Sequence, residues 1–201
     1  MKRRLIATML ALASGCGVPL PARTPSALPS TAPCQAAGWT PVAGTDGLAV
    51  CVTEPNHLVF RLGSQADKTV TIPLSDDTGG PILKAYRVSD DKVFVERHIN
   101  PHRASGVLCD LRKKTASVFY GTGFAIDQHS LDVAYWCEPQ TNQEEEPGQV
   151  FVSGRLLLSL AKRDCRSLKW GSEGELLVTI SDGSELELYP PGHESPADAD
   201  K

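Results

Sequence analysis

Hydrophobic and polar residues alternate along most of the chain between about residues 38 and 189, in short runs that end in Gly, Asp, Asn, Pro or Ser. A period of two places every second side chain on the same face, as in a β-strand with one buried face. No segment carries a strong amphipathic helical pattern, so the sequence predicts an all-β domain. The predicted strands are Leu48–Val52, Leu58–Leu62, Thr69–Leu74, Ile82–Val88, Val93–Arg97, Val107–Leu111, Ser117–Tyr120, Phe124–Ile126, Leu131–Trp136, Val150–Val152, Leu156–Leu160, Leu168–Trp170, Leu176–Ile180 and Leu186–Tyr189.

Two of the segments between these runs contain residues that favour tight turns. Asp182-Gly183, within Ser181–Ser184, and Ser153-Gly154 both place a glycine where a tight hairpin requires positive φ. The glycine pair Gly79-Gly80 and the run Gly121-Thr122-Gly123 precede no helical pattern. They are therefore predicted to be turns and not phosphate-binding loops.

The second half of the chain contains a weak repeat. Phe124–Asp127 followed by Leu131–Trp136, and then Leu168–Val178, each give a strand, a polar turn and a second strand, with Gln149–Leu160 and Gly183–Tyr189 as outer strands. Over about residues 105–189 this pattern resembles WD-type and periplasmic Tol-type β-propeller repeats. The resemblance implies an antiparallel meander in a propeller-like sheet array. At about 40 residues per blade the array is small or incomplete, and a β-sandwich is the alternative.

The first sixteen residues have the organisation of a bacterial secretion signal. Three cations at positions 2–4 precede the apolar run Leu5–Ala13, and the small residues Ser14 and Gly15 precede Cys16. The apolar run is about half the roughly 20 residues that a membrane-spanning helix needs.

Leu12-Ala13-Ser14-Gly15-Cys16 resembles the lipobox of bacterial lipoproteins, although Ala13 stands where leucine is usual. The resemblance implies cleavage after residue 15 and lipidation of Cys16 with acyl chains such as palmitate. Gly17, in place of the aspartate that commonly retains lipoproteins at the inner membrane, implies the periplasmic face of the outer membrane.

The composition divides the chain into four segments. Residues 1–15 are the predicted signal peptide, and residues 16–37, rich in Pro, Ala, Ser and Thr, are a predicted tether. Residues 38–189 form the predicted all-β domain, and residues 190–201 a loose tail. Because residues 1–15 hold three cations and no anion, their removal changes the formal charge from −4 to −7. An acidic mature chain argues against nucleic acid as a partner.

Besides Cys16, the chain has five cysteines, and an oxidising compartment favours disulfides between them. Cys34 and Cys51 bracket the start of the predicted domain. Cys109 and Cys137 each alternate with apolar neighbours and so face the interior. The sequence predicts the pairs Cys34–Cys51 and Cys109–Cys137, with Cys165 left as a thiol.

Candidate chemistry is sparse. His98 and His102 have a metal-binding spacing for a helix, but Pro101 lies between them, so a polar loop is expected and no metal site or cofactor is predicted. The acidic run Glu144–Glu146 is read as a solvated loop. Tryptophans at strand positions are more often core than groove residues, and these are Trp39, Trp136 and Trp170.

The sequence shows no catalytic motif, neither a Gly-x-Ser-x-Gly elbow nor a Cys-x-x-Cys pair. We therefore expect a membrane-anchored envelope lipoprotein that acts as a binding or scaffold domain for protein or glycan. An envelope enzyme with residues that converge only in three dimensions is an alternative. An accessory subunit of a transport or secretion system is another.

Overall fold

The computed structural model describes residues 38–193, apart from 54–55, 64–67, 76–79, 101–102, 139–147 and 161–164. Within these ranges the regular elements are strands and no helix occurs. The strands are β1 (Thr40–Pro41), β2 (Ala49–Thr53), β3 (His57–Arg61), β4 (Thr69–Pro73), β5 (Ile82–Ser89), β6 (Lys92–Asn100), β7 (Arg103–Asp110), β8 (Thr115–Ile126), β9 (Val133–Cys137), β10 (Gly148–Val152), β11 (Arg155–Leu160), β12 (Cys165–Trp170), β13 (Leu176–Ile180) and β14 (Glu185–Leu188).

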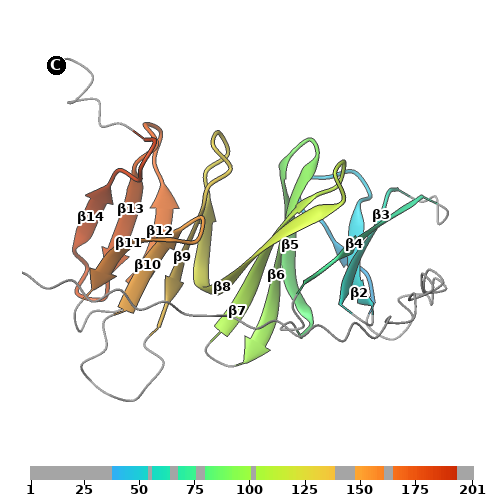
Figure 1. Ribbon diagram of the computed structural model, residues 1–201, viewed down its shortest axis with the longest axis horizontal. Helices are drawn as coiled ribbons and strands as arrows, with labels where there is room; N and C mark the ends of the chain where they lie inside the picture. Colours follow the sequence, from blue (N-terminus) through green and yellow to red (C-terminus); the bar gives the residue numbers. More distant parts are fainter. Residues whose placement is uncertain are drawn as a thin grey trace, which may run out of the picture. The chain divides into compact units, whose positions relative to one another are not determined.

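Within each sheet, strands that follow one another in sequence pair antiparallel, so each sheet is a meander (Figure 1). The sheets contain β1–β4, β5–β11 and β12–β14, and none of them closes on itself. The predicted all-β antiparallel meander in a propeller-like, unclosed array is confirmed. The described residues form three sheets in place of the two that a sandwich requires.

The long strand β8 takes part in two groups of strands. Its first half pairs with β7, from Thr115 to Gly121, and its second half pairs with β9. The register shifts between Thr122 and Ala125, where Gly123 has φ +60°. Such a bulge bends a strand and increases its twist.

The predicted turn at Gly121–Gly123 is therefore wrong, because this segment continues the strand. A Cβ at Gly121 would lie 2.5 Å from the carbonyl oxygen of Trp136. Glycine is needed here for the close approach of β8 to β9, which the composition alone cannot distinguish from a turn.

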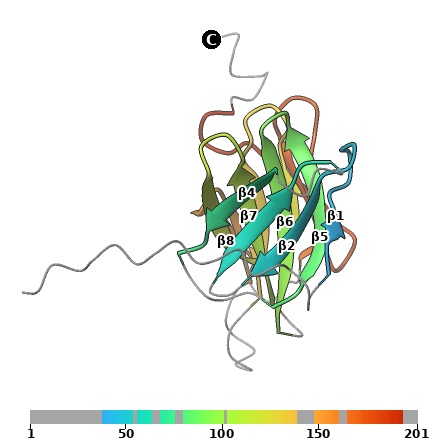
Figure 2. The same cartoon turned by 90° about the vertical axis from the view of Figure 1, so that its right-hand side faces the viewer.

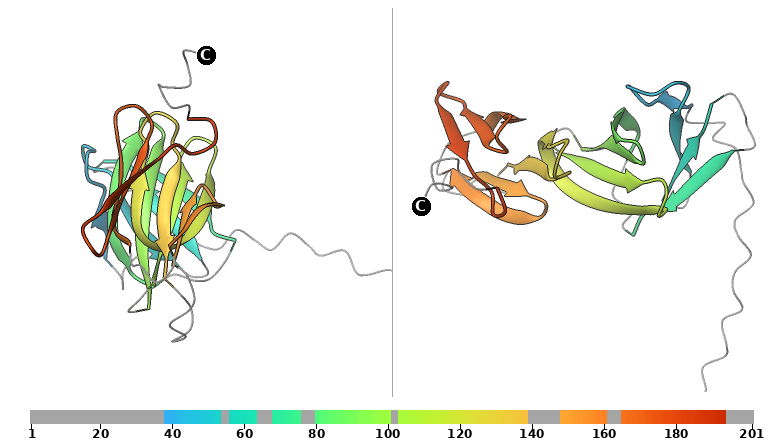
Figure 3. Two further views of the ribbon diagram at one scale, coloured as in Figure 1. Left: turned by 90° about the vertical axis from the view of Figure 1, so that its left-hand side faces the viewer. Right: turned by 90° about the horizontal axis from the view of Figure 1, so that it is seen from above.

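Three hydrophobic cores lie between successive groups of strands. The first core contains Leu58, Phe60 and Ile72 from the β1–β4 sheet and Val93 and Val107 from the seven-stranded sheet. Figure 2 shows the strands of the first sheet in front of β5–β8, and Figure 3 shows the groups side by side from above. Each sheet thus buries its apolar face against the next group of strands.

The last core joins the end of the seven-stranded sheet to β12–β14. Trp136 and Val150 of the seven-stranded sheet pack there with Leu176, Val178 and Ile180 of β13. Trp170 adds a hydrogen bond from its Nε1–H to the Ala125 carbonyl oxygen at 3.3 Å.

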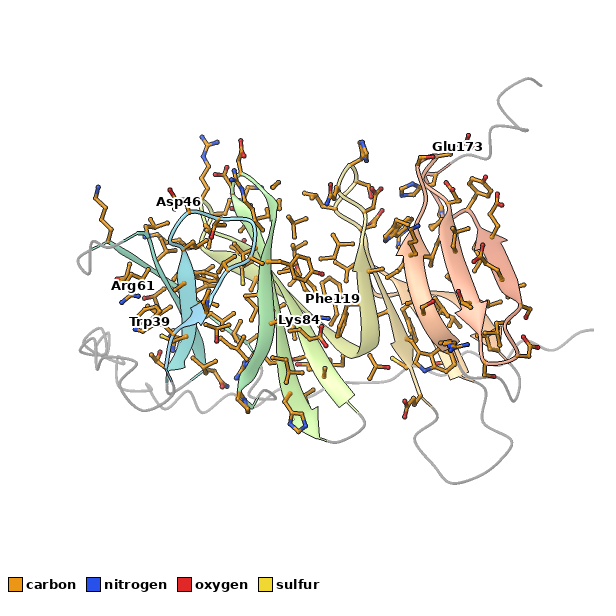
Figure 4. The ribbon with its side chains drawn as sticks, turned by 180° about the vertical axis from the view of Figure 1, so that it is seen from behind. Trp39, Asp46, Arg61, Lys84, Phe119 and Glu173 are labelled. Atoms are coloured by element: carbon orange, nitrogen blue, oxygen red, sulfur yellow. The ribbon has the colours of Figure 1, made fainter. Side chains whose placement is uncertain are left out.

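The middle core is aromatic and lies between the two halves of the seven-stranded sheet. Ring centroids in contact are 5.4–6.0 Å apart, and the rings are those of Tyr86, Phe94, Phe119, Phe124, Tyr135 and Phe151. Figure 4 labels Phe119 between the two halves. Each aromatic pair contributes about 0.5–1.5 kcal/mol beyond the area that it buries.

Gly106 of β7 has no side chain, and ring atoms of Phe94 and Phe124 occupy the space where a Cβ would lie. A Cβ at this position would lie 2.4 Å from Phe94 Cζ and 2.7 Å from Phe124 Cε1. Phe94 is fully buried beside this glycine.

The packed part of the chain extends beyond residue 189, where the sequence placed its end. Pro190 is buried, and the His193 ring lies 5.3 Å from the Trp170 ring. The contact places the segment after β14 on the last core.

Candidate functional site

A groove of about 550 Å³ lies between the β10–β11 hairpin and the segment that follows β14. Leu156 and Leu157 of β11 line one side, and Tyr189, Pro190 and Pro191 line the other. Its volume is within the range of pockets that bind ligands, about 300–1,000 Å³. The groove is the candidate binding site of the described fold.

The hairpin turn places a serine at the base of this groove. Ser153 and Gly154 have φ of 47° and 86°, as a two-residue turn with two left-handed residues requires. The predicted hairpin at Ser153-Gly154 is confirmed, with Val152 paired to Arg155. A hydrogen bond from the Ser153 amide to the Val133 carbonyl oxygen, at 2.8 Å, holds the turn against β9.

Asp132 connects this turn to the segment after β14. The Ser153 hydroxyl donates to Asp132 Oδ1 at 2.6 Å, and His193 Nε2 lies 3.1 Å from Asp132 Oδ2. Burial raises the pKa of Asp132, but hydrogen bonds from Ser153, His193 and Ser130 outweigh it, so the pKa lies below its usual value. The carboxylate is therefore already satisfied by the protein itself.

This arrangement does not form a serine nucleophile. In a catalytic triad the imidazole lies between the serine and the carboxylate, where it accepts the hydroxyl proton. Here the carboxylate lies between Ser153 and His193. The three residues tie together the walls of the groove, and their role is structural.

Two side chains at the groove remain available to a ligand. Arg155 is exposed, and no carboxylate among the described residues lies within ion-pair distance of it. Leu156 exposes 53% of its surface. Tyr189 differs, since its hydroxyl lies 2.6 Å from Glu187 Oε1, a hydrogen bond that raises the pKa of Tyr189 to about 12.

The predicted bond between Cys109 and Cys137 is wrong. Cys109 is a buried thiol on β7, and burial raises its pKa to about 12. The Cys137 thiol on β9 lies 3.1 Å from the Tyr120 carbonyl oxygen. The two side chains belong to different cores, the first for Cys109 and the middle one for Cys137, so alternation brought both inside but not together.

The remaining cysteine predictions have different outcomes. Cys51 is disulfide-bonded, while Cys34 lies outside the described residues, so that pairing stays a prediction. Cys165 is a thiol, as predicted, and burial raises its pKa to about 11. Cys16 also lies outside the described residues.

The other candidates do not meet in one site. His98 is half-buried on β6, and His102 and Glu144–Glu146 are outside the described ranges. The described residues include no group of three or more His, Cys, Asp or Glu side chains placed to hold a metal ion. They also include no helix long and apolar enough to cross a membrane.

The three tryptophans lie apart from the groove lining. Trp136 is 3% exposed in the last core, as a strand tryptophan is expected to be. Trp170 packs in the same core. The Arg61 guanidinium carbon lies 4.6 Å from the centre of the Trp39 ring, at the opposite end of the fold (Figure 4).

The fold and the groove define a class: an open, propeller-like all-β domain with a ligand-sized groove beside its last sheet. No protein-family model matches the chain, and no curated protein is similar to it in sequence. Among solved structures, it is similar to one described as YCF48 bound to D1 peptide, with a TM-score of 0.37 and 10% identity. The match covers 73% of this chain and 52% of that chain, about half of its length.

Proposed function

We propose that this chain is an envelope lipoprotein that holds a β-rich binding domain at the membrane through lipid on Cys16. The observation that carries the proposal is the cysteine placed directly after a basic segment, a short apolar run and two small residues. Gly17 favours the periplasmic face of the outer membrane. The Pro-rich residues 16–37 then separate the domain from the lipid.

A binding role fits the chemistry of the groove better than catalysis does. Its serine, carboxylate and imidazole are engaged with one another, while Arg155 and Leu156 face outward. An exposed guanidinium beside an exposed apolar side chain recognises a polar and an apolar group of one partner.

The anchor is tested in cells with an alkyne analogue of palmitate. We expect label on the full chain and none on Cys16→Ser, whereas Cys165→Ser, a matched cysteine variant, keeps the label. On gentle fractionation the wild-type chain stays with membranes and Cys16→Ser is released. An unlabelled wild-type chain would contradict the anchor.

The binding role is tested with a photo-crosslinking amino acid at position 156 in the full chain. We expect a crosslinked adduct in envelopes, and none from position 83, a leucine that is also 53% exposed. Equal results at the two positions would refute a binding role for the groove.

A further inference from the structure

The strand β11 has an unpaired edge beside the groove. It is the last strand of the seven-stranded sheet and pairs only with β10 among the described strands. An edge strand presents a row of backbone N–H and C=O groups with which another extended chain can pair. The edge of β11 is therefore a template for an additional strand.

The opposite edge of the same sheet is partly occupied. There, the Ala43 amide donates to the Ala85 carbonyl oxygen at 2.9 Å, and the Arg87 amide donates to the Ala43 carbonyl oxygen at 2.9 Å. These bonds cover the middle of β5. The comparison leaves β11 as the more accessible edge of this sheet in the described structure.

The side chains of β11 give its edge little protection, and the one irregularity is a register shift that leaves Leu157 without a partner in β10. Natural edge strands are often shielded by charges or proline, but Arg155–Leu160 contains four leucines, one serine and one charge, at its first residue. Leu156 is 53% exposed, and the groove lies directly against Leu156 and Leu157. A strand added along this edge would bring side chains against Leu156 and Leu157 at the groove, with the regular alternation interrupted at Leu157.

Charge indicates which residue the added strand carries. The Asp132 carboxylate accepts a hydrogen bond from Ser153 and lies 3.1 Å from His193 Nε2, whereas Arg155 has no carboxylate within ion-pair distance among the described residues. A guanidinium binds a carboxylate through two parallel hydrogen bonds. The groove therefore suits Asp or Glu next to apolar residues.

We propose that the edge of β11 and the adjoining groove bind an extended segment of a partner protein, with an acidic residue at Arg155 and an apolar residue at Leu156. This inference rests on the proposed binding function and names the class of partner. The partner adds a strand to β11, and its backbone supplies affinity while Arg155 and Leu156 supply specificity.

The test selects peptides from a random twelve-residue phage-displayed library on the immobilised full chain. We expect the selected sequences to alternate apolar residues and to contain Asp or Glu. The affinity of one synthetic selected peptide is measured by fluorescence anisotropy, and hydrogen exchange should show protection of β11 amides when it is bound.

Variants of the full chain assign the contacts. Arg155→Glu and Leu156→Lys should each weaken binding about tenfold, and a peptide with its acidic residue changed to Lys should regain affinity for Arg155→Glu. Leu83→Lys is the matched control, because it places the same charge on an equally exposed leucine at the other edge. Circular dichroism and thermal unfolding establish that each variant is folded.

Four results would overturn the proposal: no enriched peptide, enriched peptides without acidic residues, affinities unaffected by Arg155→Glu, or self-association of the chain that Leu156→Lys abolishes. The last result identifies a second copy of this chain as the occupant. None of these four results bears on the lipid anchor, which the palmitate label at Cys16 measures. The crosslink at Leu156 tests whether the groove binds any partner, so it can succeed even if the partner has no acidic strand.

Discussion

Gly106 and Ser105 are neighbours on β7, and alanine should destabilise the domain at position 106 but not at position 105. At position 106 a new methyl group would lie 2.4 Å and 2.7 Å from ring atoms of Phe94 and Phe124, where ordinary contacts are about 3.4–4 Å. The rings must move within a core where Phe94 is fully buried. At position 105 the change removes the Oγ of a side chain that is 1% exposed and has no hydrogen-bond partner among the residues that the structure describes.

The magnitudes follow from these contacts. Overpacking a core costs about 1–3 kcal/mol, and the smaller chain entropy of alanine returns about 0.5–1 kcal/mol. A 2.4 Å approach calls for the upper part of that cost, about 2–3 kcal/mol, so Gly106→Ala should lower the free energy of unfolding by about 1–2.5 kcal/mol and Tm by roughly 2–10 °C for a domain of this size. Ser105→Ala should leave stability unchanged or raise it by about 1 kcal/mol, because an unpaired buried hydroxyl is lost.

Urea unfolding of the full chain, followed by tryptophan fluorescence, measures both variants against the wild type. The three midpoints should rank Gly106→Ala below the wild type and Ser105→Ala at or above it. Equal midpoints for Gly106→Ala and the wild type, or a larger loss for Ser105→Ala than for Gly106→Ala, would refute the described packing at β7.

Three further measurements test other parts of the structure. Cys109 should resist alkylation by iodoacetamide in the native state, and Cys165 should react slowly, because the first thiol is fully buried and the second is partly exposed. Mass spectrometry that finds Cys109 modified first would contradict this. Asp132→Asn should lower stability at pH 7, and its difference from the wild type should shrink as pH falls below about 4, because a depressed pKa stabilises only above the unfolded value; a difference that is constant from pH 7 to pH 2.5 would disprove this. Gly183→Ala should lower Tm because Gly183 has φ +85° in the β13–β14 hairpin, where a Cβ introduces backbone strain. Asp182→Ala is the control that changes only the neighbouring side chain. A thermal unfolding curve of Gly183→Ala that matches the wild type would exclude backbone strain at position 183.

Much of the strand order follows from alternation, because the period of two is a local property. The hairpins at Ser153-Gly154 and Asp182-Gly183 are confirmed, since a positive φ has a recognisable residue preference. The continuous strand through Gly121–Gly123 was not predicted, because a glycine that admits a neighbouring strand has the same sequence signal as a turn. The pairing of Cys109 with Cys137 was wrong because the alternation of apolar and polar residues shows that a side chain is buried but not which core it enters.

The groove could be predicted only in part. Ser153 lies in a predicted turn, but Asp132 and His193 are 61 positions apart in the chain, and no local pattern joins them. His193 fell in a segment predicted to be a loose tail. Exposed Arg155 and Leu156 became informative only when the sheet order made β11 an edge.

Because β8 completes one group of strands and opens the next, β5 to β11 share a continuous backbone ladder, and loss of β8 would remove hydrogen bonds from both halves. The β12–β14 sheet adjoins that ladder through side chains such as Trp170. Tyr189 and the prolines follow the last strand of this sheet, while Leu156 belongs to the ladder. A partner bound in the groove would contact both the ladder and the segment after β14, so we expect binding to stabilise the packing of the β12–β14 sheet against the ladder.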